Sequence, residues 1–165
     1  MIPPTVLNVD DSEDDVVMLK AACDSAKVSF RFQSAGSGEN ALLYLQGAAP
    51  YSDRERFPFP ALLLLDLKMP GTSGFDVLQS ISASKDPSFQ RLAVVVFTSS
   101  MHDEDAARAF ELGADAYLVK PSDFNELRRI VTACDSLLAR GDLDLSDLRH
   151  LPDAKIAPAT EKHDS

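Results

Sequence analysis

The sequence has no tryptophan and only two cysteines, Cys23 and Cys134, among its 165 residues. The two cysteines lie far apart in the chain and form no C-x-x-C pair, so the sequence indicates neither a disulfide framework nor a thiolate metal site. Both occupy apolar positions in segments with helical periodicity. We therefore expect two buried, reduced thiols that contribute to the core.

Basic residues are also scarce, because 16 lysines and arginines stand against 26 acidic residues and give a formal net charge of −10. Such a surface disfavours nucleic acid and anionic lipid as partners. The chain has no apolar stretch approaching the roughly 20 residues that a membrane-spanning helix needs. Its first residues, Met1-Ile2-Pro3-Pro4, have no basic region ahead of an apolar run, as a secretory signal would. These absences predict a cytoplasmic protein that binds neither nucleic acid nor membrane.

Apolar residues make up 45% of the chain and charged residues 25%, values that are typical of a globular domain. The hydrophobic pattern predicts a single domain over residues 1–140. From Gly141 onward the residues are mostly acidic and polar, include two prolines, and follow no sustained period. We expect residues 141–165 to form an acidic, poorly ordered C-terminal tail, with at most a short helical turn around 145–151.

Strand and helix patterns alternate along the predicted domain. Strand patterns cover residues 5–10, 28–35, 61–66, 92–97 and 114–119, and a helical pattern follows each of them. The third strand contains four consecutive leucines and can be buried on both faces. The alternation predicts an α/β fold with a parallel sheet and right-handed crossovers. Residues 47–60, with three prolines, form a long loop that is either a contact surface or a tolerated insertion.

Polar side chains gather where the predicted strands end. They are Asp10 and Asp11 after the first strand, Asp66 after the third, Thr98 after the fourth and Lys120 after the fifth. In parallel sheets of this kind, ligands bind beyond the carboxyl ends of the strands. Three carboxylates at one edge repel one another, so a cation is expected among them, and hard oxygen ligands suit Mg²⁺.

The same residues indicate a reaction. A carboxylate beside Mg²⁺, an ammonium and a hydroxyl is equipped to attack a phosphoryl group, because the cations neutralise charge on the phosphoryl oxygens. The product would be an acyl phosphate on Asp66. Each residue alone has a plainer explanation: Asp10 and Asp11 as acids at a helix start, and Lys120 as a solvated charge. Their occurrence together favours the phosphoryl site.

Four short motifs in this order resemble those of response-regulator receiver domains of two-component signalling. The resemblance covers about residues 5–138, and its motifs are Val9-Asp10-Asp11, Asp66-Leu67-Lys68-Met69-Pro70 with Gly74, Thr98-Ser99, and Lys120-Pro121. It implies a flavodoxin-like, doubly wound (βα)5 sheet with strand order 2-1-3-4-5. It also implies that a histidine kinase phosphorylates Asp66.

The resemblance assigns a role to each matching position. Asp11 would ligate Mg²⁺ directly, Asp10 would hold a metal-bound water, and Asp66 and the backbone carbonyl of Lys68 would complete the protein ligands. Thr98 and Lys120 would each bind a phosphoryl oxygen.

Four more roles follow from the resemblance. Tyr117 matches the aromatic switch position and would swing inward when Thr98 moves, so that the face made by helix 103–112, strand 114–119 and the last helix changes shape. Without the resemblance, Tyr117 would be taken as a half-buried core aromatic. The bond before Pro121 would be cis and would re-aim Lys120. The side chains of Lys68 and Ser100 would tune dephosphorylation.

The chain is similar to stand-alone receivers, and in particular to regulators that pair with phytochrome-type kinases. The implied partners are such a kinase, a downstream protein target or phosphotransfer protein, and a second copy of the chain. It would not be an enzyme beyond assisting its own phosphotransfer and dephosphorylation.

Three alternatives stay open. The first is a phosphorylation-independent scaffold. The second is a phosphoaspartyl phosphatase, which would need a second aspartate where Lys68 stands. The third is a flavodoxin-like nucleotide or flavin protein, in which the turn after the first strand should be rich in Gly, Ser or Thr to bind phosphate.

Overall fold

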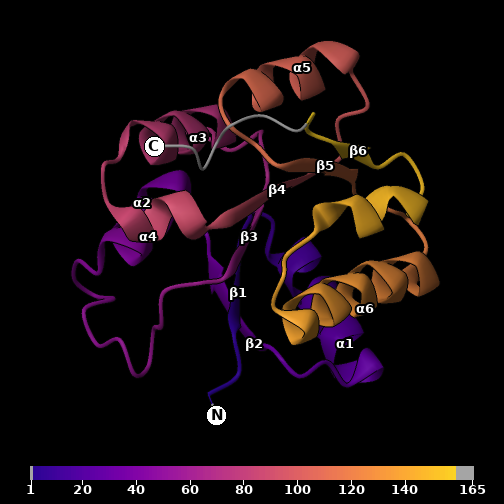
Figure 1. The fold of residues 1–165 in the computed structure, drawn as a ribbon, viewed down its shortest axis with the longest axis horizontal. Coiled ribbons are helices and arrows are strands. Elements are labelled where there is room, and N and C mark those ends of the chain that lie inside the picture. The colour runs from indigo at the N-terminus through magenta and orange to yellow at the C-terminus, as the bar shows by residue number, and fades with distance from the viewer. Residues whose placement is uncertain (1, 159–165) are drawn as a thin grey trace.

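The computed structural model describes residues 2–158, which form a sheet with helices on both faces (Figure 1). The strands are β1 Thr5–Val9, β2 Arg31–Ala35, β3 Leu62–Leu65, β4 Ala93–Thr98, β5 Ala116–Val119 and β6 Lys155–Ile156. The helices are α1 Glu13–Ala26, α2 Gly38–Gln46, α3 Gly74–Ala83, α4 Pro87–Arg91, α5 Asp103–Glu111 and α6 Phe124–Arg140, followed by the 3₁₀ helix η1 Leu145–His150. The short helix α4 was not expected from the sequence.

The strand order is β2-β1-β3-β4-β5-β6. The first five strands pair in parallel, which confirms the predicted α/β class and the order 2-1-3-4-5. The sixth strand, which was not predicted, pairs antiparallel with β5. Because the five parallel strands point the same way, their carboxyl ends meet at one edge of the sheet.

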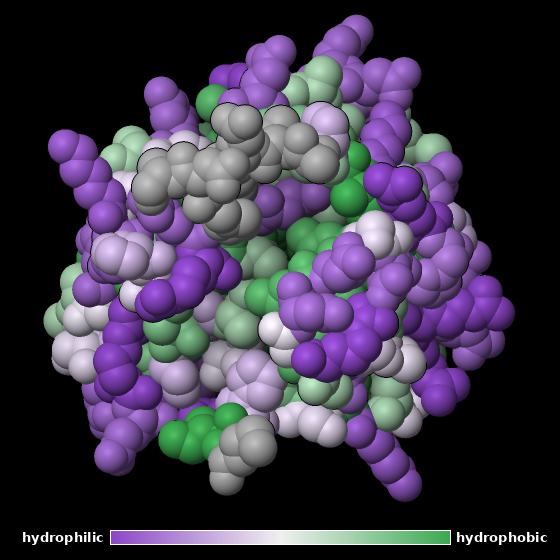
Figure 2. Space-filling model, viewed as in Figure 1, coloured by the Kyte–Doolittle hydropathy of each residue, from purple (hydrophilic) through white to green (hydrophobic). Residues whose placement is uncertain are grey.

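The four leucines of β3 divide between two cores. Leu63 and Leu65 pack with α2, α3 and α5, whereas Leu62 and Leu64 pack with α1 and α6 on the other face. All four are almost completely buried, as the apolar run predicted. Figure 2 shows hydrophilic side chains over most of the outer surface in this view, with apolar side chains in a hollow near its centre and in smaller groups elsewhere.

Serine side chains cap the helices α1, α2 and α3, which follow the first three strands. Ser12 caps α1, Ser37 caps α2 and Ser73 caps α3, and each side chain accepts a hydrogen bond from the backbone N–H three residues later. Such a cap satisfies an N–H that has no partner within the helix. These caps fix the residue at which each helix begins after its strand.

The short helical turn expected around 145–151 is present as η1, whereas the other described residues of 141–158, for which poor order was expected, pack onto the domain. Leu148 in η1 and Leu151 after it are 0% and 4% exposed and join the core shared with α1 and α6. Residues Lys155 and Ile156 pair with Tyr117 and Ala116 on the edge of β5. The few apolar residues of this charged segment can pack onto the domain, because β5 offers an open sheet edge to which the segment pairs. The predicted tail residues 159–165 lie outside the described part.

Replacing Leu148 with Ala is expected to lower the free energy of unfolding by about 2–4 kcal/mol, because it removes a completely buried leucine and leaves a cavity. Urea denaturation followed by circular dichroism measures the change. The control is Val17→Ala on α1, since Val17 is 65% exposed, and its effect should stay within about 0.5 kcal/mol. Equal unfolding curves for Leu148→Ala and the wild type would contradict the packing of η1.

One arginine joins the long loop between α2 and β3 to the end of α2. The Arg54 guanidinium donates to the carbonyls of Tyr44 at 2.8 Å, Phe57 at 3.0 Å and Leu45 at 2.9 Å. The rings of Tyr44, Tyr51 and Phe57 lie 5.1 to 5.9 Å apart. Much of the loop's aromatic surface is therefore turned toward the protein.

Both cysteines are free and buried, as predicted. Burial raises the pKa of each thiol to about 12, so both stay protonated at neutral pH. None of the helices formed by residues 2–158 is long and apolar enough to cross a membrane.

Candidate functional site

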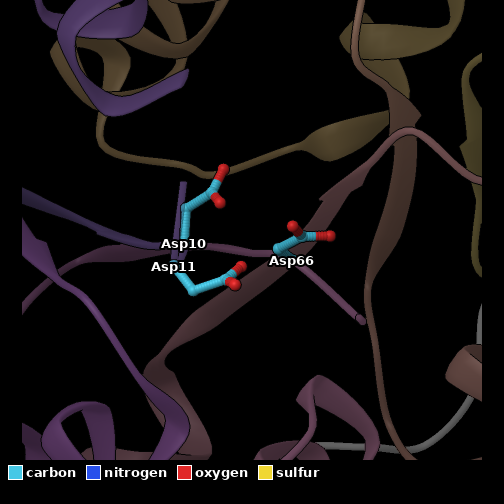
Figure 3. A group of neighbouring side chains, drawn as sticks. All are labelled: Asp10, Asp11 and Asp66. Atoms are coloured by element: carbon cyan, nitrogen blue, oxygen red, sulfur yellow. The ribbon is translucent and has the colours of Figure 1, made fainter. Parts of the chain in front are cut away.

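Three carboxylates meet at the carboxyl edge of the sheet. Asp10 and Asp11 follow β1, Asp66 follows β3, and one oxygen from each lies within 4.8 Å of the others. Figure 3 shows the side chains at neighbouring strand ends, with the Asp11 carboxylate extending toward Asp66. Asp10 and Asp66 are 3% and 7% exposed, whereas Asp11 is exposed. Two nearly buried acids thus stand beside one that faces solvent.

Lys120, which follows β5, places its ammonium among the carboxylates. Its Nζ lies 2.6 Å from Asp10 Oδ2 and 3.2 Å from Asp66 Oδ2. It also lies 2.8 Å from Oδ2 of Asp15 on α1, a contact that the sequence analysis missed. Asp15 lies in the first turn of α1, whereas Asp11 precedes the helix, so no helical spacing in the sequence connects the two residues.

Burial and ion pairing shift the pKa values of Asp10 and Lys120 in opposite directions. Burial raises the pKa of the Asp10 carboxyl, although the hydrogen bond from Lys120 partly opposes the shift. Burial would lower the pKa of the Lys120 ammonium, but the hydrogen bonds to Asp10 and Asp15 and the charge of Asp66 outweigh it, and the net result is a raised pKa. Lys120 is therefore a firmly held cation at neutral pH.

One oxygen of Asp66 has no hydrogen-bond partner although it is buried. Lys120 contacts Oδ2, while Oδ1 is without a partner among the described residues. A buried carboxylate oxygen without a partner is costly, and a bound cation would satisfy it. The oxygen set of Asp10, Asp11 and Asp66 is the kind that Mg²⁺ prefers, so these residues fit the predicted ion.

Thr98 and Tyr117 lie beside the same edge and are both 1% exposed. Tyr117 points inward, and its hydroxyl donates to the Ser100 carbonyl at 2.9 Å. The Ser100 hydroxyl in turn donates to Asp105 Oδ2 at 2.5 Å, which lowers the pKa of Asp105. The predicted switch residue is thus connected through Ser100 to the first turn of α5. Asp105 is, after Asp15, the second residue at this site that the sequence did not indicate, because it resembles an ordinary acid at a helix start.

The Lys68 side chain is turned toward α5. Its Nζ lies 3.5 Å from Asp105 Oδ2, and the side chain is 64% exposed. With Asp66, Thr98 and Lys120 it lines an open depression of ≈ 360 Å³, together with Asp15, Ser99, Ser100 and His102. The depression opens to solvent beside Asp66.

The expected cis bond before Pro121 is absent. Among residues 2–158 the cis peptide bond is the one between Ala49 and Pro50. A trans bond before proline is intrinsically favoured by about 0.5–1 kcal/mol. With a trans bond between Lys120 and Pro121, the Lys120 ammonium contacts the carboxylates of Asp10, Asp15 and Asp66.

The sheet edge beside Tyr117 is covered. β6 pairs onto β5, with Lys155 opposite Tyr117. The Lys155 ammonium also lies 2.6 Å from Asp103 at the start of α5 and lowers the pKa of that carboxyl. The C-terminal segment therefore occupies part of the face made by α5, β5 and α6, which the sequence analysis expects to change shape.

Comparison with known proteins identifies the family of this chain. Residues 6–132 match the family model described as the response regulator receiver domain. The chain therefore belongs to the response regulator receiver domain family. Receiver domains are signalling modules of two-component systems, and the flavodoxin-like fold and strand order found here are those of the family.

Relatives of this receiver domain include regulators connected with phytochromes. Response regulator Rcp1 of Synechocystis sp. is 30% identical over 134 residues, which cover 81% of this chain and 88% of Rcp1. The phosphorylated cyanobacterial phytochrome response regulator RcpA has a similar structure, with a TM-score of 0.73 and 25% identity, covering 84% of this chain and 96% of RcpA. The Mn²⁺-bound form of Rcp1 has a TM-score of 0.69 and 30% identity, covering 81% of this chain and 93% of that one.

Proposed function

We propose that this receiver domain accepts a phosphoryl group on Asp66 from the phosphohistidine of a histidine kinase. The observation that carries the proposal is the environment of the Asp66 carboxylate. It is nearly buried, has one oxygen without a partner, and lies beside the Lys120 ammonium and two further acids. The open depression at Asp66 gives a phosphohistidine ring access to that carboxylate.

Asp66 is the nucleophile of the transfer. One of its carboxylate oxygens attacks phosphorus, the new O–P bond forms as the N–P bond breaks, and the electron pair of the broken bond remains on the imidazole nitrogen. Lys120, whose ammonium lies 3.2 Å from Asp66, neutralises charge on a phosphoryl oxygen. Thr98, at the end of β4, donates its hydroxyl to another. No side chain has to remove a proton from Asp66, because a carboxylate attacks in its ordinary charge state.

Asp11, Asp66 and the Lys68 carbonyl, with Asp10 in support, would hold Mg²⁺, and the bound ion would add positive charge near the phosphoryl oxygens. The acid cluster fits this role, and one relative was crystallised with Mn²⁺. Without a cation, three carboxylates would repel the incoming phosphoryl group.

The phosphorylated state is read at the face made by α5, β5 and α6. When Thr98 turns toward the phosphoryl group, the loop through Ser100 moves with it, and that loop holds Tyr117 and Asp105. The change at this face regulates binding of a downstream protein, a phosphotransfer protein or a second copy of the chain. Because relatives are named as phytochrome response regulators, a phytochrome-type kinase is the proposed donor.

The test is phosphorylation of the purified protein by acetyl phosphate, followed on Phos-tag gels. We expect a shifted band that forms with Mg²⁺, is lost when EDTA replaces Mg²⁺, and disappears on treatment with hydroxylamine, which cleaves acyl phosphates. A band of equal intensity in EDTA, or one that resists hydroxylamine, would contradict the proposal.

A further inference from the structure

Asp15 is the one acid at the Lys120 ammonium that does not belong to the acid cluster at the strand ends. It lies in the first turn of α1, where its backbone N–H donates to the Ser12 cap and fixes its position. Its Oδ2 is 2.8 Å from Lys120 Nζ, and its side chain is 47% exposed. Among the described residues, the acids grouped closely enough to hold a cation together are Asp10, Asp11 and Asp66, so Asp15 stands outside that set.

The three contacts use the full hydrogen-bonding capacity of Lys120. An ammonium has three N–H donors, and Asp10, Asp15 and Asp66 each accept from Lys120 Nζ. Two of these three acceptors are also acids that the proposed metal ion uses. Lys120 and the metal ion therefore compete for the carboxylates of Asp10 and Asp66.

A divalent cation at Asp10 and Asp66 repels the ammonium and weakens its hold on both acids. Lys120 nevertheless has to stay in the site, because it pairs with the phosphoryl group in the transfer. Asp15 is the acceptor that remains available to it. We propose that Asp15 is a positioning residue, which draws the Lys120 ammonium away from the oxygens that Asp10 and Asp66 offer to the metal ion, while keeping it within reach of a phosphoryl group on Asp66. This inference rests on the proposed function, since it concerns the same site.

The test compares Asp15→Ala with the matched control Asp14→Ala. Asp14 precedes Asp15 in the first turn of α1, is also exposed, and carries the same charge. The probe is Mn²⁺, whose free ion gives an EPR signal that is lost on binding, with Mg²⁺ as the competitor. Without Asp15 the ammonium binds Asp10 and Asp66 more firmly, so the dissociation constant for Mn²⁺ should rise about fivefold. Asp14→Ala should raise it less than about twofold, because exposed charges are screened.

A double-mutant cycle separates positioning from simple loss of charge. In a Lys120→Met background no ammonium competes with the metal, so adding Asp15→Ala should change the dissociation constant no more than adding Asp14→Ala does. Asp15→Glu, which keeps the carboxylate, should bind Mn²⁺ within about twofold of the wild type. Circular dichroism of each variant checks that it is folded.

Two results would overturn the inference. The first is an equal effect of Asp15→Ala and Asp14→Ala in the presence of Lys120. The second is an Asp15→Ala effect that persists undiminished in the Lys120→Met background, since Asp15 would then act on the metal directly. Failure of the proposed function is distinguishable, because the wild type would then neither bind Mn²⁺ nor become phosphorylated.

Discussion

Replacement of Asp66 with Asn is expected to abolish phosphorylation by acetyl phosphate, with a loss of at least roughly a hundredfold in rate, because an amide is not a nucleophile toward phosphorus. The change keeps the size of the side chain and its place after β3, so the fold should be retained. Intact-protein mass spectrometry after incubation with Mg²⁺ and acetyl phosphate measures the phosphorylated fraction. A phosphorylated Asp66→Asn protein would show that another residue is the acceptor.

The matched control for this prediction is Asp14→Asn. Asp14 is an exposed acid on α1 close in sequence to the acid cluster, and replacing it removes the same charge. Its phosphorylation rate should stay within about twofold of the wild type. Loss of labelling in both variants would instead indicate that net charge near the site, and not the Asp66 carboxylate, controls the reaction.

Replacement of Gly74 with Ala is expected to lower the free energy of unfolding by about 2–3 kcal/mol. Gly74 begins α3, and the chain after β3 folds back so closely that an added Cβ would lie 2.2 Å from the Asp66 carbonyl oxygen and 2.7 Å from Leu67 Cα. Both are backbone atoms, so the loop itself would have to move. The Gly74 N–H also donates to the Leu67 carbonyl at 2.9 Å, and this turn would open.

Gly36 provides the control for Gly74, because an added Cβ there meets nothing within 4 Å. Gly36→Ala should change the free energy of unfolding by less than about 1 kcal/mol. Urea denaturation gives the stability of both variants, and acetyl phosphate labelling gives their activity. Gly74→Ala should also be phosphorylated more slowly, since the moving loop carries Asp66 and Lys68. Equal stabilities for the two variants would contradict the close approach at Gly74.

The sequence determined the parallel sheet and the positions of its acids. The leucines of β3, buried on both faces, and the polar residues at the ends of the first, third, fourth and fifth strands could be read directly. Strand direction alone brings the carboxyl ends of parallel strands to one edge. Asp10, Asp11, Asp66, Thr98 and Lys120 were predicted in this way. The structure brings Lys120 to two of these acids and groups the three acids with one another.

Only the tertiary structure decided which acids contact the Lys120 ammonium. Asp15 and Asp105 resemble ordinary helix-start residues in the sequence, and their contacts with Lys120 and Ser100 depend on how α1 and α5 are oriented on the sheet. Side-chain geometry of this kind has no period that a sequence could display. The bond before Pro121 was likewise trans in the structure, against the expectation from the resemblance.

The C-terminal segment is a further case in which the sequence could not predict the tertiary contacts. Its charged composition predicted poor order for residues 141–165 apart from a short helical turn, which is present as η1, but the strand β6 was not expected. Their order depends on a buried pocket for Leu148 and on the unpaired edge of β5, both of which are supplied by distant parts of the chain. Local composition determines whether a segment can fold by itself, whereas the neighbouring surface determines whether it folds in place.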